Sequence, residues 1–308
     1  MSDFFATWAW PWWTVIVFIN IINLTVGGLI YSRSLHPKDG SEEKYRKRMR
    51  IMGVIFILVA AYRSVFVSRY ITQLAWFDSV LNSSLLIRLF ATAAELSFSG
   101  LIALALLQTN RDLPSADPDN EKGLISFLGS KSPYFLMVCI FLAQFFATAG
   151  VITKSKTLFA IEETFWTAGF LAVLPLAIIQ VRRVFTIRDE KLIEDTKFFR
   201  RSTIVIAAWC VGYCCYGLFY HLPLESWAGA IIQIKTGFPA IKTGSQAVMD
   251  AFLIVNETKE YSDWGFGFLL WHSAYFSICA WISIFLMQAP RLMPNRLNQS
   301  IEPSPSGK

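Results

Sequence analysis

The sequence predicts an all-α integral membrane protein, a polytopic transmembrane helical bundle of about seven spans. Of its 308 residues, 54% are hydrophobic and only 16% are charged, whereas an average soluble domain has roughly 25% charged residues. The mean hydropathy is +0.45. The apolar residues form long continuous runs without the alternation of barrel strands, so each run is expected to be a helix.

Seven of these runs are long enough to cross a bilayer. Crossing roughly 30 Å of hydrocarbon takes about 20 apolar residues. The runs of this length are residues 12–32, 51–70, 85–108, 133–153, 163–184, 203–222 and 264–288. We therefore expect residues 1–288 to form one seven-helix transmembrane domain. Residues 289–308 are rich in Pro and Ser and are expected to form a disordered cytosolic tail.

Residues 222–263 fit this scheme less simply. They are apolar in places, but Lys235, Pro239 and Lys242 interrupt the apolar stretch. We expect helices that lie on the outer surface or dip into the membrane interface, in preference to an eighth span.

The distribution of Lys and Arg predicts the orientation of the chain. Segments 33–50 and 182–201 hold seven each and segments 109–131 and 289–308 hold three each, which makes twenty on one side against six on the other. The basic side of a membrane protein faces the cytosol, so we expect the N-terminus outside and the C-terminus inside, in a plasma membrane or a bacterial inner membrane. The tryptophans at positions 8, 10, 12 and 13 would then anchor the outer interface.

A weak internal repeat suggests a three-plus-one-plus-three arrangement of the spans. Residues 94–114 and 274–294 align without gaps and share seven identities. Tyr62 and Tyr213 each follow the last arginine of a basic loop by twelve residues. Spans one to three and five to seven would then be parallel repeats, as some transporters have. Chance similarity between two helices rich in Leu and Ala is the alternative.

Several polar residues inside the spans mark a candidate site. Ionisable groups in a bilayer are costly unless they are paired or hydrated. Glu95 follows Arg88 by seven residues, two turns along the same helix face. With the expected orientation, the charged groups gather in the outer half of the membrane. The predicted ligand-binding residues, which would line an aromatic-walled pocket open to the outside, are Arg63, Arg88, Glu95, Tyr62, Tyr213, His221 and His272.

Each of these residues also has a structural interpretation. Arg63 and Arg88 could extend to the outer headgroups, and Glu95 could form an ion pair with either of them. Both candidate histidines could be neutral and hydrogen-bonded. Glu162 and Glu163 are expected at the start of a span, where carboxylates stabilise the helix dipole and need no function.

The sequence lacks the motifs of the common enzyme classes. No HExxH, GxSxG, P-loop, GxGxxG or CxxCH pattern occurs, and there are only three histidines. The five cysteines have no CxxC spacing, and residues 264–288 have no lysine for a retinal Schiff base. No metal site is predicted, and no cofactor is indicated.

A transporter or permease for a small, anionic ligand is the function that the sequence favours. Two arginines would hold the ligand, and Glu95 would couple protons to transport. A seven-helix receptor or sensor for a small molecule is the first alternative, followed by a membrane enzyme and by an accessory subunit of a membrane complex. The expected partners are the lipid bilayer and a small molecule or ion. An oligomer is compatible with the sequence, and nucleic acid is not expected because the basic residues flank apolar spans.

Overall fold

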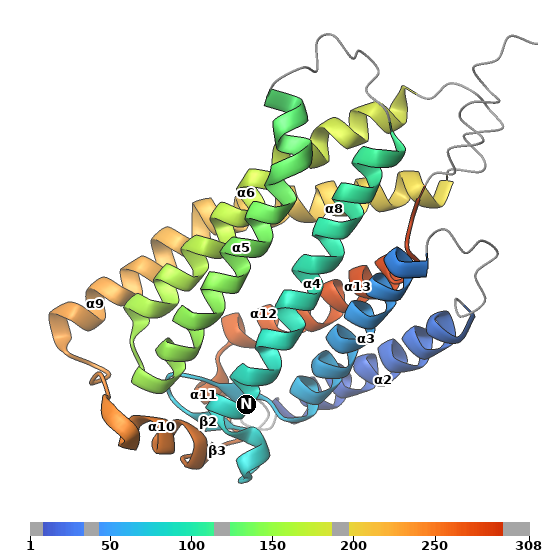
Figure 1. The fold of residues 1–308 in the computed structure, drawn as a ribbon. Helices are drawn as coiled ribbons and strands as arrows, with labels where there is room; N and C mark the ends of the chain where they lie inside the picture. Colours follow the sequence, from blue (N-terminus) through green and yellow to red (C-terminus); the bar gives the residue numbers. More distant parts are fainter. Residues whose placement is uncertain (1–8, 34–42, 114–123, 187–196, 292–308) are drawn as a thin grey trace, which may run out of the picture.

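The structure, a computed structural model, describes residues 9–33, 43–113, 124–186 and 197–291. It is almost entirely helical, and its long helices form one bundle (Figure 1). The long helices are α2 (Ala9–Arg33), α3 (Glu43–Val65), α4 (Ser84–Asp112), α5 (Leu124–Thr153), α6 (Lys156–Phe185) and α8 (Lys197–Tyr216). Trp8 and most of the expected tail, residues 292–308, lie outside the described residues.

Within the described residues, six helical segments are long and apolar enough to cross a membrane. They are Ala9–Arg33, Ser84–Asp112, Phe127–Thr153, Lys156–Phe185, Lys197–Thr236 and Phe266–Leu286. The expected span at 51–70 is missing from this set. Its helix, α3, begins eight residues earlier in a basic cluster and ends at Val65, so its apolar part is short. Helix α3 nevertheless packs between α2 and α4 in the bundle.

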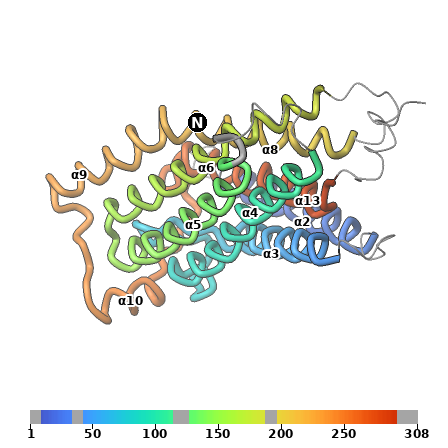
Figure 2. Tube along the Cα trace, turned by 45° about the horizontal axis from the view of Figure 1, so that its top comes forward, coloured from blue at the N-terminus to red at the C-terminus, as the bar shows by residue number. Residues whose placement is uncertain are grey.

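The helices pack in chain order from α2 to α8, and the last segment closes the bundle (Figures 1 and 2). This segment consists of α12 (Phe266–Ala274), the π-helical η4 (Tyr275–Cys279) and α13 (Ala280–Leu286). Helix α13 contacts α2, α3, α4 and α8. The core between the helices holds large apolar side chains such as Phe56, Phe98 and Phe170, all fully buried.

Large apolar side chains also cover the outside of the bundle. Phe18, Phe141 and Phe145 are between 52% and 62% exposed. A soluble monomer rarely exposes extended apolar surface, which instead marks contact with a membrane or a partner. Together with the six apolar helices, this surface identifies a multi-pass membrane protein that contacts the lipid bilayer.

The sixth expected span is longer than residues 203–222. Helix α8 continues without a break through the π-helical η3 (Gly217–Trp227) into α9 (Ala228–Thr236), as the yellow-to-orange helix in Figure 1 shows. It ends where Gly237 adopts a φ of +67°, a left-handed conformation that suits glycine at a helix C-terminus. Residues 222–263 were expected to form separate helices at the outer surface, but residues 222–236 belong to this long helix. The separate helices are α10 (Gly244–Leu253) and the short α11 (Tyr261–Trp264).

One end of the bundle carries a small cap, which we define as residues 66–83 and 237–265. It contains the 3-10 helix η2 (Val80–Asn82), α10, α11 and three two-residue strands. β1 (Ser68–Arg69) pairs antiparallel with β2 (Leu74–Ala75), which pairs parallel with β3 (Asn256–Glu257). These strands are the one departure from the expected all-α fold in the described chain.

The tryptophans at the start of α2 hold the cap. Trp13 stacks on Trp76 with centroids 5.5 Å apart, and Trp10 meets the same ring edge-on at 5.3 Å. Trp13 donates a hydrogen bond to the Val65 carbonyl, and Trp12 donates one to the Ser273 hydroxyl. The indole N–H groups of Trp12 and Trp13 are therefore used within the protein and are not free to bind lipid headgroups, as anchoring at the interface would require.

Candidate functional site

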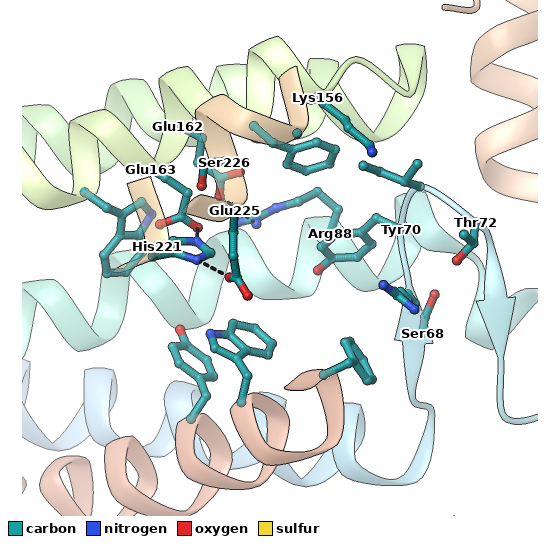
Figure 3. A pocket seen from close by; sticks show the side chains of 18 of the residues that line it. Ser68, Tyr70, Thr72, Arg88, Lys156, Glu162, Glu163, His221, Glu225 and Ser226 are labelled. Carbon is teal, nitrogen blue, oxygen red and sulfur yellow. Dashed lines mark hydrogen bonds and ion pairs between the residues drawn. The ribbon is translucent and has the colours of Figure 1, made fainter. Parts of the chain in front are cut away.

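A cavity of about 830 Å³ lies where the helices meet the cap. Helices α3, α4, α6, α8, α9 and α12 line it, together with η3, η4, β1 and the turn after it, and the turns that follow α5 and α9. Its polar and charged lining residues are Arg63, Ser68, Arg69, Tyr70, Thr72, Arg88, Glu95, Lys154, Lys156, Glu162, Glu163, Tyr213, Tyr216, His221, Glu225, Ser226 and Tyr275. Figure 3 shows many of these side chains pointing toward one another.

Arg88 lies in the wall of the cavity and has its partners inside the protein. It is 2% exposed and donates to Glu95 over 2.6 Å and to the Gln144 side-chain oxygen over 2.5 Å. A longer contact of 3.4 Å reaches Glu162 on α6. These contacts join α4, α5 and α6 around a single guanidinium. Buried ion pairs need such additional hydrogen bonds to offset the loss of hydration.

Arg63 is buried to a similar degree but has a different environment. It is 4% exposed, and it donates one hydrogen bond of 3.0 Å to the Tyr70 hydroxyl. The guanidinium carbon lies 4.8 Å from the centroid of the Phe276 ring. Among the described residues, no carboxylate lies within ion-pair distance of Arg63. The cavity wall thus contains a buried cation with neutral partners.

His221 connects two carboxylates at another part of the wall. Its Nδ1 lies 2.7 Å from Glu225, one turn further along η3, and its Nε2 lies 3.4 Å from Glu163 on α6. Glu163 also accepts a hydrogen bond of 3.3 Å from Tyr213 on α8. The π-helical backbone of η3 carries both His221 and Glu225, and such irregular turns are frequent at functional sites.

The turn between α5 and α6 lines the cavity with Lys154, and the first residue of α6, Lys156, lines it as well. Burial lowers the pKa of the Lys154 amine, and the nearby positive charge of Lys242 lowers it further. Gln233 on α9 holds this turn in place. Its amide nitrogen donates to the Lys154 and Pro239 carbonyls over 2.8 and 2.7 Å, and its oxygen accepts from the Lys156 backbone N–H over 2.7 Å.

Five of the seven predicted site residues line this one cavity: Arg63, Arg88, Glu95, Tyr213 and His221. Tyr62 and His272 do not line it. Tyr62 points to the cap and donates to the Leu81 carbonyl over 2.6 Å. Adjacent helical residues face different directions, which separates Tyr62 from Arg63.

His272 is fully buried behind the wall. It is 1% exposed and packs against the rings of Trp12, Phe268 and Phe276, whose centroids lie 4.5 to 5.5 Å away. Its neighbour Trp271 and the residue three positions later, Tyr275, line the cavity instead. The predicted binding role of His272 is thus not supported by direct contact with the cavity.

The sequence reasoning missed three glutamates of the cavity, Glu162, Glu163 and Glu225. Glu162 and Glu163 were expected to begin a span, but α6 begins at Lys156 and both residues lie about two turns into it. Both line the cavity, and Glu162 is 5% exposed. The sequence contains one signal that could have found Glu162 and Glu163. A span that begins at Lys156 instead of residue 163 places both glutamates within the membrane, where ionisable groups are candidate site residues.

The donor set does not suggest a metal site. No group of three His, Cys, Asp or Glu side chains in the described part of the chain has the geometry to hold a metal ion. All five cysteines are free thiols. Comparisons of the chain with family models, with curated proteins and with solved structures find no match.

Proposed function

We propose that this protein is a transporter that carries a small ligand with an anionic group across a cell membrane. The ligand binds in the cavity beneath the cap, and Arg63 holds its anionic group. In this proposal α3 is a seventh span, the capped end faces outward and the basic end faces the cytosol. The host membrane is the plasma membrane or a bacterial inner membrane.

The environment of Arg63 is the observation that carries the proposal. A buried cation usually has a carboxylate partner, because removing a charge from water is costly. Among the described residues, Arg63 directly contacts the neutral Tyr70 side chain and the face of Phe276. The carboxylate of Glu162 acts on it from beyond ion-pair distance. A ligand carboxylate or phosphate would complete this environment with charge-assisted hydrogen bonds, for which arginine is well suited.

The size of the cavity and its irregular helices support transport of a small molecule. Small-molecule pockets typically occupy about 300–1,000 Å³, and this cavity has about 830 Å³. Two of the helices around it contain π-helical segments, η3 and η4. In transporters, irregular helices near the substrate site are common because a polar cavity tolerates freed backbone groups.

The test starts from binding and proceeds to flux. We expect small carboxylates such as succinate, benzoate or pentanoate to raise the melting temperature of the detergent-purified protein, while their amides do not. The Arg63→Gln variant loses one or two charge-assisted hydrogen bonds of about 1.5–3 kcal/mol each. Its affinity for the stabilising carboxylate should fall by at least about tenfold.

The flux measurement uses the stabilising carboxylate in radiolabelled form with proteoliposomes. Lys235→Gln is the matched control, because Lys235 is an exposed cation on α9 outside the cavity lining. Uptake should be lost in Arg63→Gln and kept in Lys235→Gln. Binding without uptake would contradict transport and favour a receptor, and equal binding by Arg63→Gln would contradict the anion site.

A further inference from the structure

We infer that the ligand also carries an ammonium group, so that the substrate class is a small zwitterion with one carboxylate and one amine. The ammonium binds between Glu163, Glu225 and the aromatic rings on the far side of the cavity from Arg63. This inference rests on the proposed function, because it assigns the second half of the same ligand.

The charge of this part of the cavity wall is the first argument. Glu95 and Glu162 share Arg88, and Glu163 and Glu225 share His221. Four carboxylates therefore face two cationic groups here even when His221 is protonated, and Arg63 acts on one of the four, Glu162, from beyond ion-pair distance. Arg88 and Glu162 are 2% and 5% exposed, so water screens their charges weakly. The side chains of Glu163 and Glu225, in contrast, are 25% and 46% exposed and remain open to an incoming ligand. The excess negative charge favours a positively charged ligand group.

The aromatic lining is the second argument. The rings of Trp166, Tyr213, Trp271 and Tyr275 line the same cavity. Trp271 and Tyr275 stack with their centroids 5.3 Å apart, and Trp166 lies 5.9 Å from Tyr213. Aromatic faces bind ammonium groups through the negative charge density of the ring, and Trp and Tyr do so best. Carboxylates next to such faces are suited to an organic cation.

An unpartnered hydroxyl gives an independent indication of a ligand. The Tyr275 oxygen is fully buried and has no hydrogen-bond partner among the described residues. Buried polar atoms in proteins are almost always hydrogen-bonded. The hydroxyl lies within electrostatic range of Glu95 and of Tyr213. A ligand N–H donor in the cavity would supply the partner that this oxygen lacks.

The groups assigned to the two ligand charges lie on opposite sides of Arg88 in Figure 3. Figure 3 shows Glu163 and His221 on one side of the view and Tyr70 and Ser68 on the other, with Arg88 between them. Arg63 belongs to the second side, because it donates its hydrogen bond to Tyr70. A molecule with an amine at one end and a carboxylate at the other matches this arrangement of charges.

Pairs of isosteric ligands test the inference on the purified full-length protein. Each pair has one zwitterion and one carboxylate of the same shape without the positive charge. Suitable pairs are β-alanine with butanoate, γ-aminobutyrate with pentanoate, and phenylalanine with 2-methyl-3-phenylpropanoate. Affinities are measured by calorimetry and by thermal shift. We expect at least one zwitterion to bind about tenfold or more tightly than its isostere.

Variants of Glu163 and Glu225, which we call the acidic end of the cavity, locate the ammonium site. Glu163→Gln and Glu225→Gln should each lower the affinity of that zwitterion and leave the affinity of its isostere unchanged. Glu225 is the safer variant for folding, because its side chain is 46% exposed. Glu260→Gln is the matched control, an exposed carboxylate on the cap outside the cavity lining.

The outcomes separate this inference from the proposed function. If the isosteres bind as tightly as the zwitterions and Arg63→Gln abolishes both, the anion site stands and the ammonium site is overturned. If choline or sodium chloride stabilises the protein and no carboxylate does, the acidic end binds a lone cation and both proposals fall. Both also fall if no member of any pair binds.

Discussion

Two arginines of the same cavity, one helix apart, have opposite surroundings. Arg88 on α4 contacts two carboxylates and an amide oxygen, whereas Arg63 on α3 contacts a tyrosine hydroxyl and an aromatic ring. Both are less than 5% exposed. Burial alone therefore does not indicate what a charged residue does. The number and charge of its partners distinguish a group that holds the fold together from a group that is available to a ligand.

The largest expected difference between the two arginines concerns stability. Arg88→Leu leaves Glu95 and Glu162 without their counter-charge, and breaking a buried pair in this way costs about 3–5 kcal/mol. Arg63→Leu loses a single hydrogen bond of about 1 kcal/mol and removes a buried charge. Thermal unfolding in detergent should therefore show a much lower melting temperature for Arg88→Leu than for Arg63→Leu.

A double variant separates ion pairing from packing in this comparison. Replacing Glu95 by leucine in the Arg88→Leu background removes one of the stranded carboxylates. Part of the lost stability should return, with a coupling energy of about 0.5–3 kcal/mol. Equal melting temperatures for the two single variants, or no recovery in the double variant, would show that Arg88 is not the ionic centre of the bundle.

A smaller effect is expected from the hydroxyl that orients Arg63. Tyr70→Phe keeps the ring and removes the only hydrogen bond that the guanidinium makes to a described residue. We expect little change in melting temperature and a several-fold loss of affinity for the carboxylate ligands, in line with a single hydrogen bond of about 1 kcal/mol. Calorimetry checks the affinity. An unchanged affinity would mean that Phe276 and the backbone already fix the guanidinium.

The contrast between these residues also shows what the sequence can predict. The heptad spacing of Arg88 and Glu95 places them on one helix face, because a helix has 3.6 residues per turn, and the structure joins them at 2.6 Å. Hydropathy likewise predicts the long helices. For α6, however, hydropathy predicts a start at residue 163, whereas the helix begins at Lys156. The two charges of Glu162 and Glu163 resemble the polar boundary that precedes an apolar span, so the predicted start is too late.

The remaining site residues depend on tertiary packing. Tyr70 reaches Arg63 from the turn after β1, and no local pattern predicts where a short loop will fold. The π-helical η3 carries His221 and Glu225, and its extra residue per turn shifts the helical periodicity from which buried faces are predicted. In the last segment, Phe268, Trp271 and Tyr275 line the cavity at ordinary helical spacing, and His272 lies on a neighbouring face of α12 that packs into the protein.

The smallest expected effect concerns an ion pair outside the spans. Hydrogen bonds from Lys242, and then from Gln246, hold the pKa of the Asp250 carboxyl below its usual range. A lowered pKa in the folded state stabilises the cap at any pH above the ordinary value of about 4, and this contribution disappears as the pH falls through the folded-state value. Unlike Arg88, this pair is accessible to solvent, so its contribution should be slight and screened by salt.

The Asp250→Asn variant tests this contrast between buried and accessible pairs. Hydrogen exchange of the α10 amides, with labelling times corrected for the intrinsic rate, should be faster in the variant at pH 7. The two proteins should converge at acidic pH, where the wild-type carboxyl is protonated. The difference at pH 7 should also shrink in high salt. A difference that persists unchanged into acid would show that the carboxylate charge does not stabilise α10, and that the introduced side-chain amide itself disturbs the helix.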